Sequence, residues 1–270
     1  MGLDKELTDA DKGFALIASY PQFHALPIIL SEADPEGCAA CSARENPSNN
    51  YRNGPLYPVY TAATLKALLD LEARHHVNLL GMLTWSFEFE GKDYFQGFRS
   101  LATNGIDKPV LNVFRMAGKM SGQRVTTTST AQVPLDTLLA SGVRQSPDID
   151  ALATVDHHSA AILLWNYHDD DLPTPTAPVT LHININGLPT NLHHVHLQHL
   201  RIDDTHSNAY TAWKSMGSPQ QPTPAQITTL KQAGQLQSLT PPTDTAVKDG
   251  SLTLPFSLPH QATSLILLTW

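Results

Sequence analysis

The sequence predicts an α/β region followed by an antiparallel β region. Up to about residue 122, short apolar runs alternate with segments whose leucines recur at helical spacing, which is typical of parallel βα units. Past Arg124, apolar and polar residues alternate one by one, which is typical of strands with one buried face. Many of the 20 prolines lie in this second part and favour a loop-rich β structure there.

The first region contains three predicted helices and two predicted buried strands. The first helix falls within residues 7–25, with Thr8 as a candidate N-cap. The third has Pro109 in its first turn and Gly122 just past its end. In chain order, the elements after the first helix are a strand at 26–30, a loop at 31–60, a helix at 61–77, a strand at 79–89 and a helix at 108–120.

Two parallel strands are too few for a stable sheet or a closed barrel. The chain is therefore expected to start in the middle of a larger α/β unit. We place the domain boundary after residue 123, with a partial α/β unit in 1–123 and a β-sandwich accessory domain in 124–270.

The second region predicts an antiparallel β-sandwich. In the stretch 179–188, Val179, Leu181 and Ile183 alternate with polar residues. An insert at 211–239 breaks this pattern and contains a predicted short helix that begins at Thr223. The other predicted strands are 160–167, 194–202, 251–258 and 264–270, and a Pro- and Asp-rich turn is predicted at 169–178.

Composition excludes several classes of partner. A formal net charge of −8 provides no electrostatic footprint for nucleic acid or for an anionic membrane. No apolar run reaches the ~18–20 residues that span a bilayer, and the first residues lack the pattern of a secretory signal. We expect a soluble protein, and the sequence leaves open whether it is cytoplasmic or periplasmic.

Two strand ends carry the residues best suited to chemistry. Glu32 follows the apolar strand 26–30, where α/β barrels place their catalytic groups. Trp85 occupies the equivalent place on the next strand, where an aromatic ring can stack on a sugar. The alternatives are structural: Glu32 paired with an arginine such as Arg52, and Trp85 packed in a core.

Several segments together resemble the C-terminal half of glycoside hydrolase family 39, whose best-known members are retaining β-xylosidases. They are ILSEADPE, YRNGPLYPVYTAATLKAL, LTWSFEFEG, YFQGFRSLATNGIDKPVLNVFRM, WNYHDDD, LRIDDTHSNAY and SLILLTW, in the family's order and over nearly the whole chain. The resemblance implies the C-terminal part of a (β/α)8 TIM barrel followed by a β-sandwich. It also implies that Glu32 is the nucleophile, although Ser31 and Ala33 depart from the Thr-Glu-Trp or Thr-Glu-Phe that the family often carries.

The resemblance also implies a binding surface and a reaction. Trp85, Phe87 and Glu88 are expected to contact substrate, and Trp85 resembles a tryptophan that this barrel clan commonly joins to its successor by a cis peptide bond. The expected substrate is a β-xyloside or related oligosaccharide, hydrolysed with retention and without metal or other cofactor. The alternative is a non-catalytic carbohydrate-binding or assembly subunit.

The family's acid/base belongs to an Asn-Glu dipeptide, which this sequence lacks. A complementary barrel half, or a homo-oligomer, is one explanation, and a truncated remnant is another. Glu36, Glu45 and Glu88 are weaker candidates for the donor, because loop acids beside Glu32 should lie on the wrong side of the bond.

Cysteines and histidines have structural interpretations. Cys38 and Cys41 are expected to form a local disulfide or to remain two free thiols, in preference to a metal site. His194 and His196 fall on the polar phase of a strand, which favours a solvated face over metal binding. His206, within the resemblance, is expected to brace the sandwich against the barrel.

Overall fold

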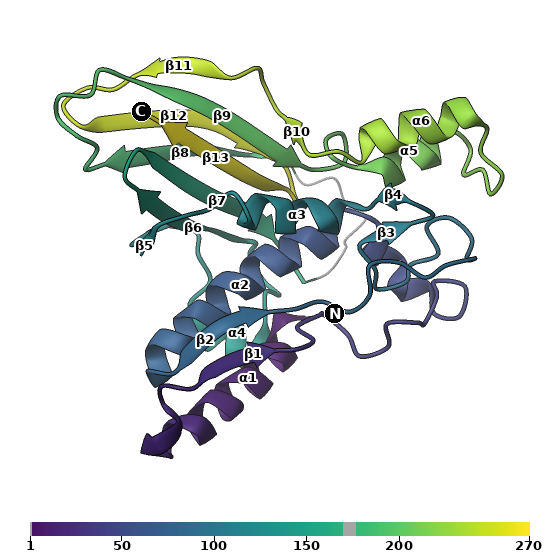
Figure 1. The fold of residues 1–270 in the computed structure, drawn as a ribbon, viewed down its shortest axis with the longest axis horizontal. Helices are drawn as coiled ribbons and strands as arrows, with labels where there is room; N and C mark the ends of the chain where they lie inside the picture. Colours follow the sequence, from purple (N-terminus) through teal and green to yellow (C-terminus); the bar gives the residue numbers. More distant parts are fainter. Residues whose placement is uncertain (1, 170–176) are drawn as a thin grey trace.

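The computed structural model describes residues 2–169 and 177–270, so most of the turn predicted at 169–178 lies outside the described residues. Helix α2 (Leu56–His75) packs between a small parallel sheet and a large antiparallel sheet (Figure 1). A second, two-stranded antiparallel sheet covers the far face of the large one. These layers form a mixed α/β fold.

The parallel unit joins β1 (Pro27–Leu30) and β2 (Asn78–Met82) through α2. Helix α1 (Leu3–Ala18) precedes it and buries Leu3, Leu7, Ala10 and Phe14, which recur every three or four residues. The predicted N-cap is wrong: Thr8 lies inside α1 and its hydroxyl donates to the Leu139 carbonyl at 3.1 Å. A 3-10 turn (η1, Pro21–Phe23) links α1 to β1.

Strand β2 is shorter than predicted and ends at Met82. Beyond Leu83, the side-chain carboxylate of Asp34 accepts hydrogen bonds from the Thr84 hydroxyl and from the Trp85 backbone amide. Ser86 then adopts a left-handed conformation with φ of 46°. A strand cannot continue through such a turn, so residues 83–101 form a loop.

The parallel sheet is bare on one face, contrary to the prediction of two buried strands. Ile29 of β1 is 52% exposed and Leu80 of β2 is 66% exposed. Their neighbours Ile28 and Leu79 pack on the main hydrophobic core from the other face. Helices therefore cover this sheet from one side only.

Helices α2 and α3 (Pro109–Ala117) form where predicted, but with different bounds. Helix α2 begins at Leu56, five residues earlier than predicted. In α3, Pro109 occupies the first turn as predicted, but the helix ends before Gly118 rather than near Gly122. Gly122 has φ of 82° and lies against the Val155 carbonyl, which leaves no room for a side chain.

Between α2 and α3, β3 (Ala102–Thr103) and β4 (Ile106–Asp107) pair in a small hairpin.

The large antiparallel sheet has the order β10-β9-β13-β7-β6-β5, with β11 also paired to β9. Strand β7 is apolar on both faces: Leu163 and Trp165 join the core under α2, whereas Ile162 and Leu164 join the cluster on the far face. The bounds are β5 (Gln123–Val125), β6 (Asp148–Asp156), β7 (Ser159–Tyr167), β9 (His194–Ile202), β10 (Gln237–Ser238), β11 (Thr243–Ala246) and β13 (Thr263–Thr269).

Strand β6 has no counterpart among the sequence predictions because two of its core-facing residues are acidic. Asp148 accepts from the indole Nε1 of Trp165 at 2.7 Å, and Asp150 pairs with Lys66 at 2.9 Å. Burial raises the pKa of Asp148 to about 6. Carboxylates with such partners can be buried in a core, and an acidic residue in the sequence does not predict a core position.

The second sheet pairs β8 (Val179–Asn186) with β12 (Ser251–Leu258). Ile183 and Ile185 of β8 pack on the far face of the large sheet, as the alternating pattern predicts. The core under α2 spans the predicted boundary at residue 123, because it contains both Leu68 of α2 and Leu163 of β7.

The insert holds α5 (Ala209–Ser215) and α6 (Pro224–Ala233), and only the second was predicted. Thr223 caps α6 as expected, in a capping box with Gln226. A short helix, α4 (Leu135–Ser141), packs on α1. No helix in the described part of the chain is long and apolar enough to cross a membrane.

Candidate functional site

Glu32 lies two residues past β1, at the carboxyl end of the parallel sheet. Backbone hydrogen bonds from Leu83 to Leu30 at 2.8 Å, and from Ala33 to Leu83 at 2.9 Å, hold the ends of β1 and β2 together around it. The Glu32 side chain is 40% exposed, and its Oε1 pairs with Nη2 of Arg99. The carboxylate is thus oriented by a cation and still open to a ligand.

Arg99 is a buried cation that contacts three residues of the loop after β1. Its side chain is 2% exposed; besides Glu32, its Nε faces Oδ2 of Asp34 at 3.5 Å and its Nη1 donates to the Glu36 carbonyl. Burial lowers the pKa of Arg99, and the carboxylate of Glu6 opposes that shift. The sequence suggested an arginine such as Arg52 as the partner of Glu32. In the structure, the partner is Arg99.

Asp34 is the most buried carboxylate at the site, with its side chain 1% exposed. Its Oδ1 accepts from the hydroxyl of Tyr57 and from that of Thr84, the latter at 2.7 Å. Its Oδ2 accepts from the backbone amide of Trp85 at 3.1 Å. Asp34 therefore ties the loop after β1 to α2 and to the loop after β2.

Trp85, Phe87 and Glu88 all lie on the loop that follows β2. Trp85 and Phe87 are 51% and 57% exposed, so Trp85 does not pack in a core. The peptide bond between Trp85 and Ser86 is trans, contrary to the expected cis bond. Glu88 accepts from the Gly105 amide at 2.9 Å and so helps to fold the loop back on the β3–β4 hairpin.

The loop after Asp34 is closed by a disulfide between Cys38 and Cys41, one of the two predicted states. The buried guanidinium of Arg52 donates to the Cys38 carbonyl at 2.9 Å and pairs with Glu36 at 3.2 Å. Arg52 belongs to a 3-10 segment, η2 (Pro47–Asn53). The disulfide and Arg52 together hold the loop that carries Glu36.

The three loop acids considered as proton donors are engaged elsewhere. Glu36 pairs with Arg52, and Glu88 accepts from Gly105. Glu45 accepts from the Ser42 amide at 2.7 Å, and this bond lowers the pKa of Glu45. In contrast, burial and the charge of Asp34 raise the pKa of Glu6, on α1, to about 7.

Lys108 is buried beneath the loop that carries Arg99. Its Nζ donates to the Phe98 carbonyl at 2.7 Å and lies 3.4 Å from the Ser100 hydroxyl. Burial, with a smaller contribution from the charge of Arg52, lowers the pKa of Lys108 to about 7. Lys108 thus anchors the carbonyl next to Arg99 in the chain.

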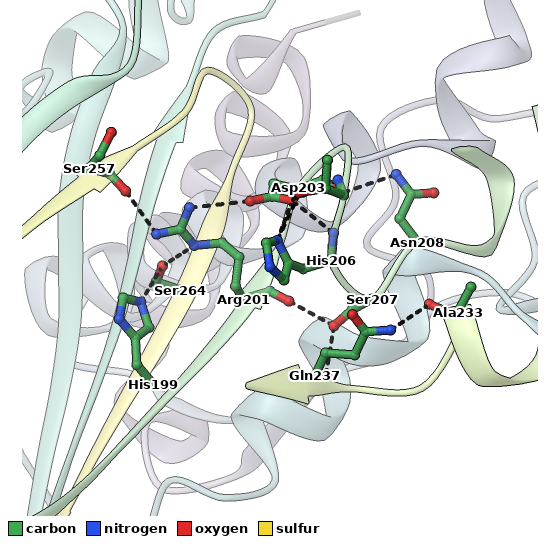
Figure 2. A network of polar contacts seen from close by, with 11 residues as sticks. His199, Arg201, Asp203, His206, Ser207, Asn208, Ala233, Gln237, Ser257 and Ser264 are labelled. Atoms are coloured by element: carbon green, nitrogen blue, oxygen red, sulfur yellow. Dashed lines mark hydrogen bonds and ion pairs between the residues drawn. The ribbon is translucent and has the colours of Figure 1, made fainter. Parts of the chain in front are cut away.

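Two of the histidines singled out in the sequence lie on β9, and a third lies in the turn after it. His194 and His196 are exposed on the polar phase of β9, as predicted, and His196 lies 3.1 Å from an Asp244 oxygen. Figure 2 shows Arg201 between the two antiparallel sheets, where it donates to the Ser264 hydroxyl and the Ser257 carbonyl. The turn after β9 carries His206, whose ring and amide contact Asp203 (Figure 2).

Ser207, next to His206, ties this turn to the helical layer: its carbonyl accepts from the buried Asn112 side chain of α3 at 3.2 Å. The turn that contains His206 therefore joins the sheets to the helices. A surface hollow of about 480 Å³ lies beside this junction, away from Glu32. It is lined by Arg115, Gly118, Lys119, Gln198, Leu200, Gln235 and Leu236.

Sequence reasoning missed Asp34, Arg99 and Tyr57 as members of the site. Asp34 had one local signal, its place two residues after Glu32 near a strand end. Arg99 and Tyr57 lie 67 and 25 residues further along the chain than Glu32, and no spacing rule connects residues across such loops.

Barrels of βα units place their functional groups at the carboxyl ends of the strands. Glu32 follows one such strand end, and Trp85 lies on the loop after the neighbouring strand. The model of the family described as "Glycosyl hydrolases family 39" matches residues 7–249. The chain belongs to this family, and the resemblance found in its motifs is confirmed.

Solved structures share the fold. The chain is similar to a GH39 enzyme from Xanthomonas axonopodis pv. citri, with 17% identity, a TM-score of 0.72, and coverage of 98% of this chain and 48% of that one. It is similar to a monomeric beta-xylosidase from Caulobacter crescentus CB15, with 17% identity, a TM-score of 0.72, and coverage of 97% and 49%. A bacterial orthologue of human α-L-iduronidase matches with 16% identity, a TM-score of 0.74, and coverage of 97% and 46%. The chain thus spans about half the length of these proteins.

Proposed function

We propose that this chain carries the nucleophile side of a retaining glycoside hydrolase that acts on β-xylosides or related β-glycosides. The observation that carries the proposal is Glu32: an open carboxylate at a strand end, oriented by the buried Arg99, in a member of family 39. A beta-xylosidase among the similar structures supports the substrate class.

In the proposed reaction, a Glu32 oxygen attacks the anomeric carbon as the bond to the leaving oxygen breaks. A general acid protonates the leaving oxygen, and a covalent glycosyl-enzyme forms. The same group then removes a proton from water, which attacks the anomeric carbon and releases the sugar and Glu32. Trp85 and Phe87 offer apolar surface to the sugar ring, and Glu88 lies beside them.

We propose that residues 1–123 are the C-terminal part of a (β/α)8 barrel and that 124–270 are its β-sandwich domain. The parallel β1–α2–β2 unit and the two facing antiparallel sheets support this assignment. The bare face with Ile29 and Leu80 would then face the interior and neighbouring strands of the barrel.

We propose further that a complementary α/β segment covers this face and supplies the acid/base. Retention requires a second carboxyl group about 5–5.5 Å from the nucleophile. The loop acids Glu36, Glu45 and Glu88 are held by other groups, so none of them is the preferred donor. The coding region directly upstream is the first place to look for the segment.

The test compares wild type with Glu32→Gln, each alone and co-expressed with the upstream segment. Hydrolysis of an aryl β-xyloside is expected from the combined form and is expected to fall on the order of 10³-fold or more in Glu32→Gln. Glu90→Gln, an exposed acid on the loop after β2, is the matched control and should retain activity. A 2-fluoro-xyloside with a good leaving group should add its sugar mass to Glu32.

Equal hydrolysis by wild type and Glu32→Gln would exclude Glu32 as the nucleophile. Xyloside binding by the combined form without any hydrolysis would instead favour the non-catalytic carbohydrate-binding alternative.

A further inference from the structure

A buried carboxylate needs compensation, because removal of a charge from water is costly unless hydrogen bonds replace the solvent. Asp34 has this compensation at both oxygens. Two hydroxyls, from Tyr57 and Thr84, donate to Oδ1, whereas the Trp85 amide and the more distant Arg99 face Oδ2.

These partners come from α2 and from the two ends of the loop 83–101. Tyr57 is on α2, Thr84 and Trp85 follow β2, and Arg99 ends the same long loop. Asp34 is two residues from Glu32. One side chain therefore connects the predicted nucleophile's loop to the aromatic surface beside it and to the cation that orients Glu32.

The contacts require a carboxylate and not an amide. Both sides of Asp34 receive donors only, and an ionised carboxylate is the side chain that accepts at both oxygens. Asparagine of the same size could accept from Tyr57 and Thr84, but its NH₂ group would face the Trp85 amide and Arg99. The charge of Asp34 also raises the pKa of Tyr57, after the larger effect of burial.

We infer that Asp34 is a positioning residue of the glycosidase site, whose carboxylate sets Trp85 and Arg99 relative to Glu32. The inference rests on the proposed function. Asp34 does not face the sugar, because its side chain is covered; it acts through the two groups that it holds.

The first measurement follows hydrogen exchange, which needs no activity. In Asp34→Asn, the Trp85 amide loses its acceptor, and its exchange is expected to quicken by about tenfold or more, whereas exchange of the Leu83 amide, bonded to the Leu30 carbonyl, should not change. Unchanged exchange at Trp85, or an equal rise at both amides, would overturn the inference. An equal rise would mean that Asp34 only supports the fold.

A second pair of variants covers the case in which Asp34→Asn does not fold. Thr84→Val and Tyr57→Phe each remove one donor to Asp34 and should also quicken exchange at Trp85 more than at Leu83. Tyr60→Phe is the control, since Tyr60 is a buried tyrosine on the same helix and is not among the donors to Asp34. Loss of Trp85 protection in Tyr60→Phe to the same extent would count against the inference.

The second measurement is kinetic and uses the combined, active form. Displacement of Trp85 and Arg99 should lower kcat for an aryl β-xyloside by about 10²-fold in Asp34→Asn, with a smaller change in KM. An unchanged kcat would overturn the inference. If wild type proves inactive while the Trp85 amide still depends on Asp34, the proposed function fails and the positioning contact stands, so the two failures are distinguishable.

Discussion

At the scale of single residues, three buried cations organise the loops around Glu32. Arg52, Arg99 and Lys108 are each about 1% exposed, and each donates to a backbone carbonyl of a loop. Arg52 and Arg99 have carboxylate partners. Lys108 donates to a carbonyl and lies close to a hydroxyl, and burial therefore lowers its pKa to about 7.

The lowered pKa of Lys108 predicts a pH dependence of stability. Between about pH 7 and 10, the unfolded chain holds a proton on this amine and the folded chain does not, so the free energy of unfolding should rise with pH. Relative to Lys108→Met, wild type should gain on the order of 1 kcal/mol per pH unit in this window. Urea unfolding at pH 7, 8 and 9 measures the difference, and parallel curves for the two proteins would contradict the assignment.

At the scale of elements, loops rather than strands build the candidate site. The loop 31–54 contributes Glu32, Asp34 and Arg52, and the loop 83–101 contributes Trp85 and Arg99. The short strands β1 and β2 supply only the fixed ends from which these loops start. The loops are ordered by their own contacts, among which the Cys38–Cys41 disulfide is covalent.

The disulfide is expected to make a modest contribution to stability. It closes a loop with a sequence separation of 3, so it restricts the unfolded chain little, and its loss should cost about 2 kcal/mol in the free energy of unfolding. Denaturation of wild type with and without reductant measures the cost, and the double variant Cys38→Ser/Cys41→Ser, insensitive to reductant, is the control. A cost near zero would show that noncovalent contacts, such as those of Arg52 and Arg99, order the loop without the disulfide.

At the scale of the whole molecule, the two faces of the small parallel sheet differ. One face packs on α2 and the main core, whereas the other leaves large apolar side chains exposed beside an open strand edge. An exposed apolar sheet with a free edge tends to pair or to self-associate. The exposed apolar residues at this end of the molecule are Leu16, Tyr20, Phe23, Leu26, Ile29, Leu80 and Leu83.

The bare face predicts concentration-dependent self-association of the chain when it is produced alone. Leu80→Glu places a charge on this face and should shift the protein toward monomer in sedimentation velocity, whereas Thr180→Glu, at an exposed position of β8, should not. In the combined form, Leu80→Glu should weaken binding of the complementary segment. A monomeric wild type with no affinity for that segment would argue against the proposed coverage.

Local sequence signals determined much of the fold. Pro109 and Thr223 mark helix starts because they act on their own first turns, and the alternation from Val179 onward defines β8 because strand faces repeat every two residues. Glu32 and Trp85 were found as candidates from equally local signals, since each lies at or near the end of an apolar run.

Only the tertiary structure decided which groups surround Glu32. Asp34 ends β2 early by accepting from Thr84 and Trp85, and Arg99 replaces Arg52 as the partner of Glu32. Both effects arise from contacts across dozens of residues, and long loops can close in many ways at similar entropic cost. Propensity and periodicity act between near neighbours along the chain, so they determine elements and strand ends, whereas the charges that meet at those ends are determined by packing.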